Sequence, residues 1–266
     1  MNRIAETFES LKQKREKALV GFVTAGDPNI SDSLSLITAM CEAGVDILEL
    51  GVPFSDPTAD GPVIQRSSGR AIAKGVNLPA VLEMTAKIRA KTEKPIILFS
   101  YYNPIHAYGN EAFYRDAEAA GADGVLVVDL PPEESDEMTD CWSGDALSLI
   151  RLIAPTTPLE RMKKIAESAS GFLYLVSKTG VTGSDGLDTS DIARHTQTLR
   201  SVSQLPICVG FGISTAEDVA AVASAAEGVV IGSAFERLIE ENLDNPALVS
   251  IIAEQVRKYK EATKIS

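Results

Sequence analysis

Short runs of apolar residues alternate along the chain with segments in which apolar residues recur at helical spacing. The runs are rich in β-branched residues and bounded by Gly, Pro or Asp, which is typical of strands. The segments between them carry apolar residues three and four positions apart, as amphipathic helices do. The expected strands are 18–24, 46–50, 95–101, 124–129, 146–153, 171–176, 206–211 and 228–231.

Helices are expected after the strands, and one before the first strand. Ile4, Phe8 and Leu11 lie at helical spacing and predict a short amphipathic helix at the start. Ser31 is expected to cap the next helix and Gly44 to end it. The remaining expected helices are about 63–74, 79–89, 111–120, 133–141, 159–168, a segment ending at 199, 215–225, and two from 234 and 246.

The expected strands are continuously apolar, which indicates burial on both faces and a parallel sheet. About eight strand–helix units over roughly 250 residues match the size of a (β/α)8 barrel. An open doubly wound sheet shares this local pattern and is the alternative, although such sheets usually have fewer strands. Because no linker or composition shift divides the chain, we expect one α/β domain, residues 1–266. It would be a TIM barrel with an extra N-terminal helix and additional helices after strands 2 and 8.

The chain is acidic, with a formal net charge of -12 over 266 residues and a pI near 4.7. This charge argues against nucleic acid or an anionic membrane as the main partner. A small anionic substrate would need local donors such as backbone amides.

The cysteines and histidines limit the possible disulfides and metal sites. Cys41, Cys141 and Cys208 are widely spaced and form no CxxC pair, as expected in a reducing compartment. The two histidines, His106 and His195, give little basis for a metal site, and we expect no metal. The first 17 residues lack an apolar signal-peptide core, and no run reaches the length of a membrane span. The expected location is cytoplasmic.

Glu49 stands inside the apolar second strand, in Asp46-Ile47-Leu48-Glu49-Leu50. An unpaired carboxylate between leucines is costly to bury, so it normally has a partner or a chemical role. The alternative is a Glu that faces solvent or pairs with a structural Lys. Active sites of barrels lie at the C-terminal ends of the strands. The same rule selects further strand-end candidates: Phe22, Asp27, Asp60, Tyr101, Tyr102, Asn103, Asp129 and Tyr174.

Glycines cluster after the last three expected strands, in Thr179–Gly183, Gly210–Ser214 and Gly232–Ser233. Glycines let backbone amides approach an anion, and a helix N-terminus favours negative charge. Loops after strands seven and eight form the recurrent phosphate site of this fold. Each glycine alone is more simply a turn residue, but three on adjacent loops favour a phosphate site. The long loop 177–189 is expected to act as a lid, or else is an ordinary surface loop.

Four aromatic residues lie near strand ends and would form a flat apolar slot for a ring, or else belong to the core: Phe22, Tyr101, Tyr174 and Phe211. Together these patterns predict a barrel enzyme that acts on a phosphate monoester, with Glu49 and Asp60 supplying acid–base chemistry.

The segment Leu48–Gln65, LELGVPFSDPTADGPVIQ, closely resembles the signature of the tryptophan synthase alpha subunit family. The resemblance runs nearly end to end. Other segments that match the family are GFVTAGDP (21–28), YYNPI (101–105), VVDLPPEES (127–135), APTTP (154–158), TGVTG (179–183) and GFGIS (210–214).

This resemblance implies a (β/α)8 barrel that cleaves indole-3-glycerol phosphate, by retro-aldol chemistry, to indole and glyceraldehyde 3-phosphate. Glu49 resembles the family's acid–base residue, and Asp60 the carboxylate that binds the indole N–H. Thr182 resembles a lid residue that contacts Asp60. The implied indole pocket and phosphate amides are at Phe22, Tyr101, Tyr174, Gly183, Gly212, Gly232 and Ser233.

The resemblance also implies a partner, the beta subunit, in an α2β2 heterotetramer that passes indole on. Asp56, Pro57, Asn103 and Pro104, in the loops after the second and third strands, are the implied interface residues. PLP is expected only in the beta subunit, so no cofactor is expected in this chain.

Two positions depart from the family pattern. Thr58 stands where the family usually has Leu or a similar apolar residue, and Lys178 where it usually has Arg. Because Arg and Lys differ in their hydrogen-bonding geometry, we expect weaker lid contacts here. Two competing hypotheses are another phosphate-binding barrel enzyme that acts on a related ribulotide and a barrel that mainly activates a partner. The carboxylate pair disfavours both.

Overall fold

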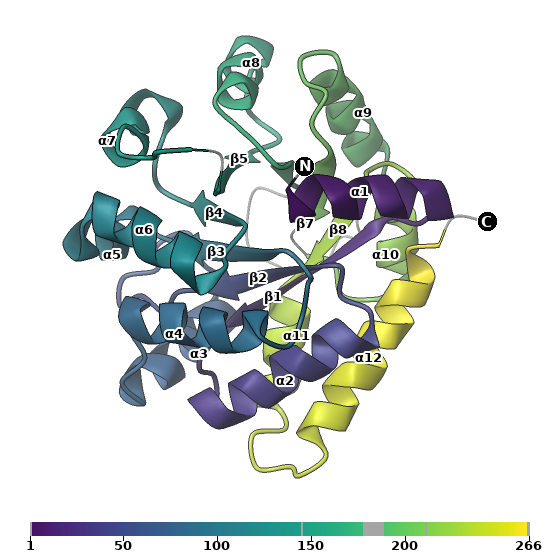
Figure 1. Cartoon of the computed structure of the whole chain (residues 1–266). Coiled ribbons are helices and arrows are strands. Elements are labelled where there is room, and N and C mark those ends of the chain that lie inside the picture. Colours follow the sequence, from purple (N-terminus) through teal and green to yellow (C-terminus); the bar gives the residue numbers. More distant parts are fainter. Residues whose placement is uncertain (1, 145, 178–188, 211, 265–266) are drawn as a thin grey trace.

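The strands form a closed barrel in which neighbours in the chain are neighbours in space (Figure 1). The computed structural model describes residues 2–144, 146–177, 189–210 and 212–264. All strand pairs are parallel, and β8 pairs with β1 to close the ring. The strands are β1 (Ala18–Thr24), β2 (Ile47–Gly51), β3 (Ile96–Ser100), β4 (Gly124–Val127), β5 (Ser148–Ile153), β6 (Leu173–Val176), β7 (Ile207–Gly210) and β8 (Gly228–Ile231).

The helices surround this barrel, and the predicted fold class is confirmed. An extra helix precedes β1, and two helices follow each of β2 and β8, as expected. The helices are α1 (Arg3–Lys14), α2 (Ile30–Ala43), α3 (Pro62–Ala73), α4 (Leu78–Arg89), α5 (Tyr102–Tyr108), α6 (Asn110–Ala120), α7 (Asp136–Thr139), α8 (Leu159–Glu167), α9 (Thr189–Arg200), α10 (Ala216–Ala223), α11 (Ser233–Glu240) and α12 (Leu248–Ala262).

Two apolar clusters fill the molecule. The larger one lies between the strands and the surrounding helices. The smaller one joins inward-facing strand residues to the apolar face of α1, where the Phe8 ring meets Phe172 with centroids 6.0 Å apart. Helix α1 therefore covers the N-terminal end of the barrel and leaves the other end for a site.

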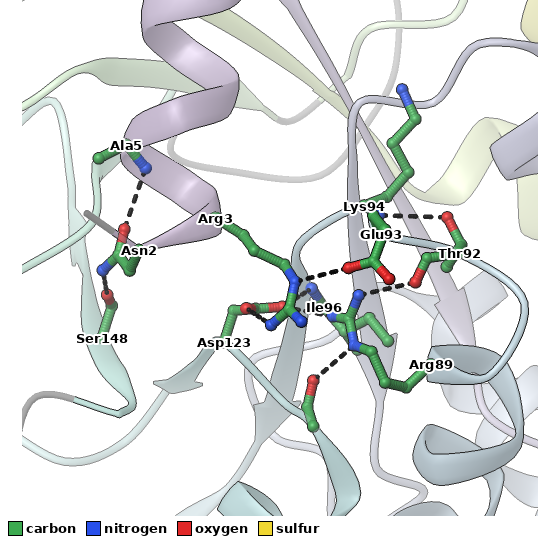
Figure 2. Close-up of polar contacts among 11 residues, drawn as sticks. Asn2, Arg3, Ala5, Arg89, Thr92, Glu93, Lys94, Ile96, Asp123 and Ser148 are labelled. Atoms are coloured by element: carbon green, nitrogen blue, oxygen red, sulfur yellow. Dashed lines mark hydrogen bonds and ion pairs between the residues drawn. The ribbon is translucent and has the colours of Figure 1, made fainter.

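Asp123, the residue before β4, holds helix α1 in place (Figure 2). Its carboxylate accepts hydrogen bonds from Arg3 on α1, from Arg89 on α4 and from the backbone N–H of Ile96. The Asp123 side chain is only 5% exposed. Next to it, Asn2 caps α1 through the N–H of Ala5 and also donates to the Ser148 hydroxyl (Figure 2).

Three local expectations were wrong. Asn29, not Ser31, caps α2, because the Asn29 side chain accepts from the N–H of Asp32. The helix expected at 133–141 is reduced to a 3-10 turn, Pro132–Glu134, and the short α7.

The third correction concerns Asn103 and Pro104, which were expected in a loop but lie in the first turn of α5. A proline is tolerated there because first-turn N–H groups have no helical partner. The carboxylate of Asp129 accepts from the first of them, the N–H of Tyr102.

We expect Asp123→Asn to lower the free energy of unfolding by about 2–4 kcal/mol, because it removes the charge that binds two partly buried guanidinium groups. Urea unfolding followed by circular dichroism measures this loss. Glu254→Gln is the control, because its ion pair with Lys258 is exposed and should not contribute measurably. Equal stability of the two variants would contradict the anchoring role of Asp123.

Candidate active site

Glu49 lies on β2 and faces the barrel interior, in register with Phe22 on β1 and Ile97 on β3. The side chain is fully buried, and neither carboxyl oxygen has a hydrogen-bond partner in the described part of the chain. Burial disfavours the charged form and raises the pKa of Glu49 to about 8. At neutral pH this carboxyl is therefore mainly protonated and can donate a proton.

Asp60 lies near the end of the loop that leads from β2 to α3, and it lines the same cavity as Glu49. Partial burial raises the pKa of Asp60 to about 6, and a hydrogen bond from the Tyr101 hydroxyl opposes that rise. The Tyr101 hydroxyl also accepts from the N–H of Ala59, at 2.9 Å. At neutral pH Asp60 is mainly ionised, so the two carboxyls have different protonation states.

The cavity between them contains about 790 Å³ of free space, part of it open to solvent. Its apolar wall includes the rings of Phe22, Phe99 and Tyr174, and the first two meet edge to face with centroids 5.1 Å apart. Tyr101 is buried but does not line this cavity; its ring contacts Phe54 instead. Phe99 was not predicted as a site residue, because it lies inside an expected apolar strand and the sequence does not distinguish it from a core residue.

Two glycines allow the aromatic rings to lie against the strands. A side chain at Gly51 would begin 2.7 Å from the ring of Phe22, and one at Gly210 would begin 2.7 Å from the Cζ of Tyr174. Such separations are too short for real contacts, so both positions require glycine while the rings stay in place.

Gly212, Gly232 and Ser233 line the same cavity, and Gly232 lies beside Phe22. Gly232 precedes α11 and Ser233 begins it, with no side chain capping the first turn. Gly212 has φ +72°, and among the described residues no atom beyond its chain neighbours lies within 4 Å of where its Cβ would be. Free first-turn N–H groups beside open space suit a phosphate.

A partly buried polar network joins α11 to α3. Arg70 on α3 donates two hydrogen bonds of 2.8 Å to Asp27 and a third to Glu240 on α11. Glu236, also on α11, is fully buried and accepts from the N–H of Thr24 at 2.6 Å. Burial and the nearby Asp27 raise the pKa of Glu236 to about 8. The network links the helix after Asp60 to the helix that starts at Ser233.

The two expected interface segments approach each other at the Phe54–Tyr101 ring contact, where the centroids are 5.2 Å apart. Asp56 and Asn103 are exposed, and Pro57 and Pro104 are half-buried. Thr58 is exposed in the turn between Asp56 and Asp60. The remaining expected site residues lie outside the described residues: Thr182, Gly183 and Phe211, together with Lys178.

Two other kinds of feature are absent from the described part of the chain. It contains no group of three or more His, Cys, Asp or Glu side chains that could hold a metal ion. None of its helices combines the length and the apolar character needed to cross a membrane.

Comparison with known proteins identifies the family. Residues 8–264 match the family model described as tryptophan synthase alpha chain. The tryptophan synthase alpha chain of Desulfosudis oleivorans is 68% identical, with all of both chains covered. That of Desulfatibacillum aliphaticivorans is 62% identical, covering 99% of this chain and 100% of the relative.

Solved structures agree. The alpha subunit of Legionella pneumophila tryptophan synthase has a TM-score of 0.91 and 40% identity, covering 99% of this chain and 98% of that chain. A structure of Mycobacterium tuberculosis tryptophan synthase also has a TM-score of 0.91, with 30% identity and coverage of 100% and 99%.

These matches confirm the resemblance of the sequence motifs and exclude the hypothesis of a ribulotide-processing barrel. In this family the alpha chain uses no cofactor, and PLP is in the beta chain. The chain belongs to the tryptophan synthase alpha chain family and is an indole-3-glycerol-phosphate lyase.

Proposed function

We propose that Glu49 and Asp60 carry the cleavage of indole-3-glycerol phosphate, with Glu49 as acid and base and Asp60 as the partner of the indole N–H. The observation that carries this proposal is the pair of carboxyls on one cavity, with pKa values of about 8 and about 6. One can deliver a proton at neutral pH, while the other can stabilise positive charge.

In the proposed reaction, Glu49 first gives its proton to C3 of the indole ring. The ring becomes an indolenine cation, and the Asp60 carboxylate accepts a hydrogen bond from its N–H. Glu49, now ionised, removes the proton of the hydroxyl next to C3. The C–C bond breaks, its electron pair returns to the ring, and indole and glyceraldehyde 3-phosphate leave with Glu49 protonated again.

The residues that line the cavity suggest how the substrate binds. We assign the indole ring to the wall of Phe22 and Tyr174, and assign to Tyr101 the support of Asp60 rather than direct ring contact. The phosphate is assigned to Gly212, Gly232 and Ser233, where amide groups are free. Roles for Thr182, Gly183 and Phe211 in the same binding site rest on the family resemblance.

We further propose that the chain forms an α2β2 complex with a beta subunit and passes indole to it. Support comes from the exposed Asp56 and Asn103, on adjoining segments near the cavity. The proposed location is the cytoplasm, consistent with three free cysteines. We regard the whole chain as a single domain, because one barrel accounts for all of its strands in the described residues.

Glu49→Gln should reduce the rate of indole formation by at least about 1,000-fold, because the amide can neither donate nor accept the reacting proton. Substrate affinity should change by less than about threefold, because the shape of the side chain is kept. Single-turnover indole release and equilibrium binding measure the two quantities. Retained turnover would refute the role of Glu49.

The stability of Glu49→Gln supplies a control for folding. The folded-state pKa of Glu49 lies above its ordinary value of 4.5, so folding retains a proton that the unfolded chain loses. The parent chain therefore loses stability as pH rises from about 4.5 to about 8, by up to about 1.4 kcal/mol per pH unit. Glu49→Gln should thus unfold at a higher urea concentration than the parent at pH 8, and not at pH 4.5.

The pH dependence of kcat/KM should be bell-shaped, with activity falling below about pH 6 and above about pH 8. Asp60 must be ionised and Glu49 protonated in the free enzyme. Steady-state kinetics from pH 5 to 9 measures the profile. Asp60→Asn should have a much lower kcat/KM, and its kcat/KM should no longer fall below about pH 6 except through ionisation of the substrate phosphate. If the acidic limb is unchanged in this variant, the limb belongs to another group.

Addition of a beta subunit should accelerate indole release from indole-3-glycerol phosphate, and sedimentation should show an α2β2 species. Asp56→Lys should weaken complex formation, because it reverses an exposed charge on the proposed interface. Asp244→Lys, an equal charge change outside the two interface segments, is the control. Equal weakening by both variants would argue for a general charge effect.

A further inference from the structure

Arg237 lies on α11, four residues after Ser233, and its side chain lines the same cavity as Ser233 and Gly212. Residues four apart share one face of a helix. Long helical side chains also lean toward the helix N-terminus. Arg237 therefore extends from the body of α11 toward the end where the free amide groups of Gly232 and Ser233 lie.

The charges around the cavity distinguish Arg237 from the other arginines nearby. Arg237 is the only Lys or Arg among the described residues that line it. Arg66 donates two hydrogen bonds to Glu240, and Arg70 is held by Asp27 and Glu240. Arg237, in contrast, makes no hydrogen bond or ion pair with any described residue.

An unpaired arginine on the surface needs no explanation by itself, because water solvates it well. Two facts make this one different: it lines the substrate cavity, and the chain carries a net charge of -12 that disfavours an anionic ligand. Backbone amides supply only partial charges, whereas a guanidinium group supplies a full charge and two parallel donors for phosphate oxygens.

We propose that Arg237 is a phosphate ligand of this enzyme, adding a side-chain cation to the amide groups at the start of α11. The inference rests on the proposed assignment of the phosphate to Gly212, Gly232 and Ser233. The role of Arg237 differs from that of Glu49 and Asp60. It strengthens substrate binding equally in the ground state and the transition state, and it takes no part in proton transfer.

Arg237→Gln should raise the KM for indole-3-glycerol phosphate about tenfold and change kcat less than about twofold, because the lost interaction is uniform binding. Arg237→Lys should recover part of the loss, since the charge returns without the second donor. Steady-state indole formation by the full chain with its beta subunit measures both constants.

Two inhibitors make the test specific for phosphate. One is an indole with a three-carbon chain that ends in phosphate, and the other is the same molecule with a hydroxyl in place of the phosphate. Arg237→Gln should weaken binding of the first about tenfold and leave binding of the second unchanged. Equal effects on both inhibitors, or no effect on either, would overturn the proposal.

A first control variant tests whether the effect of Arg237→Gln comes only from the change in net charge. Arg257→Gln removes an equal charge from an exposed position on α12 that does not line the cavity, and should leave the KM unchanged. If Arg257→Gln raises the KM as much as Arg237→Gln, the effect is one of net charge and the proposal fails.

Gly212→Asp tests the phosphate site itself, because it directs a carboxylate into the open space beside Gly212. Weaker binding of the phosphate inhibitor by Gly212→Asp, with Arg237→Gln unchanged, would keep the proposed function and reject the role of Arg237. If neither variant weakens that inhibitor, the phosphate assignment and the role of Arg237 both fail.

Discussion

Burial of one ionisable group inside a closed barrel is the constraint on which the site depends. Eight strands surround Glu49, α1 covers the opposite end, and no described residue offers its carboxyl a hydrogen bond. Burial without a partner favours the neutral acid, so the fold itself keeps a proton available at neutral pH. A hydrogen-bond donor or a cation beside Glu49 would stabilise the charged form and lower the pKa, and less of the acid would then hold its proton at neutral pH.

Much of this arrangement is predictable from the sequence, because strong local patterns encode it. Continuous apolar runs mark the strands, and a lone carboxylate among leucines marks Glu49. The strand-end rule then brings Asp60, Gly212 and Ser233 to the same end of the barrel. These inferences need only the periodicity of the chain and the cost of burying charge.

Other features depend on three-dimensional contacts and have no local signal. The first turn of α5 contains Pro104, and its capping group, Asp129, comes from the next strand end. The link from Arg70 to Asp27 spans 43 residues, and Glu236 meets the backbone of Thr24 from 212 residues away. In the sequence Arg237 looks like an ordinary surface residue of a helix. Only its position on the cavity distinguishes it.

The rings of Phe22 and Tyr174, which rest on Gly51 and Gly210, determine how the substrate range of this enzyme can be redesigned. Any larger residue at either glycine would displace a ring beside the proposed indole site. Trimming the ring instead, as in Phe22→Leu, enlarges that space while leaving the strand untouched. Variants that accept bulky substituted indoles should therefore be sought at the aromatic positions. The glycines beneath the rings should not tolerate substitution.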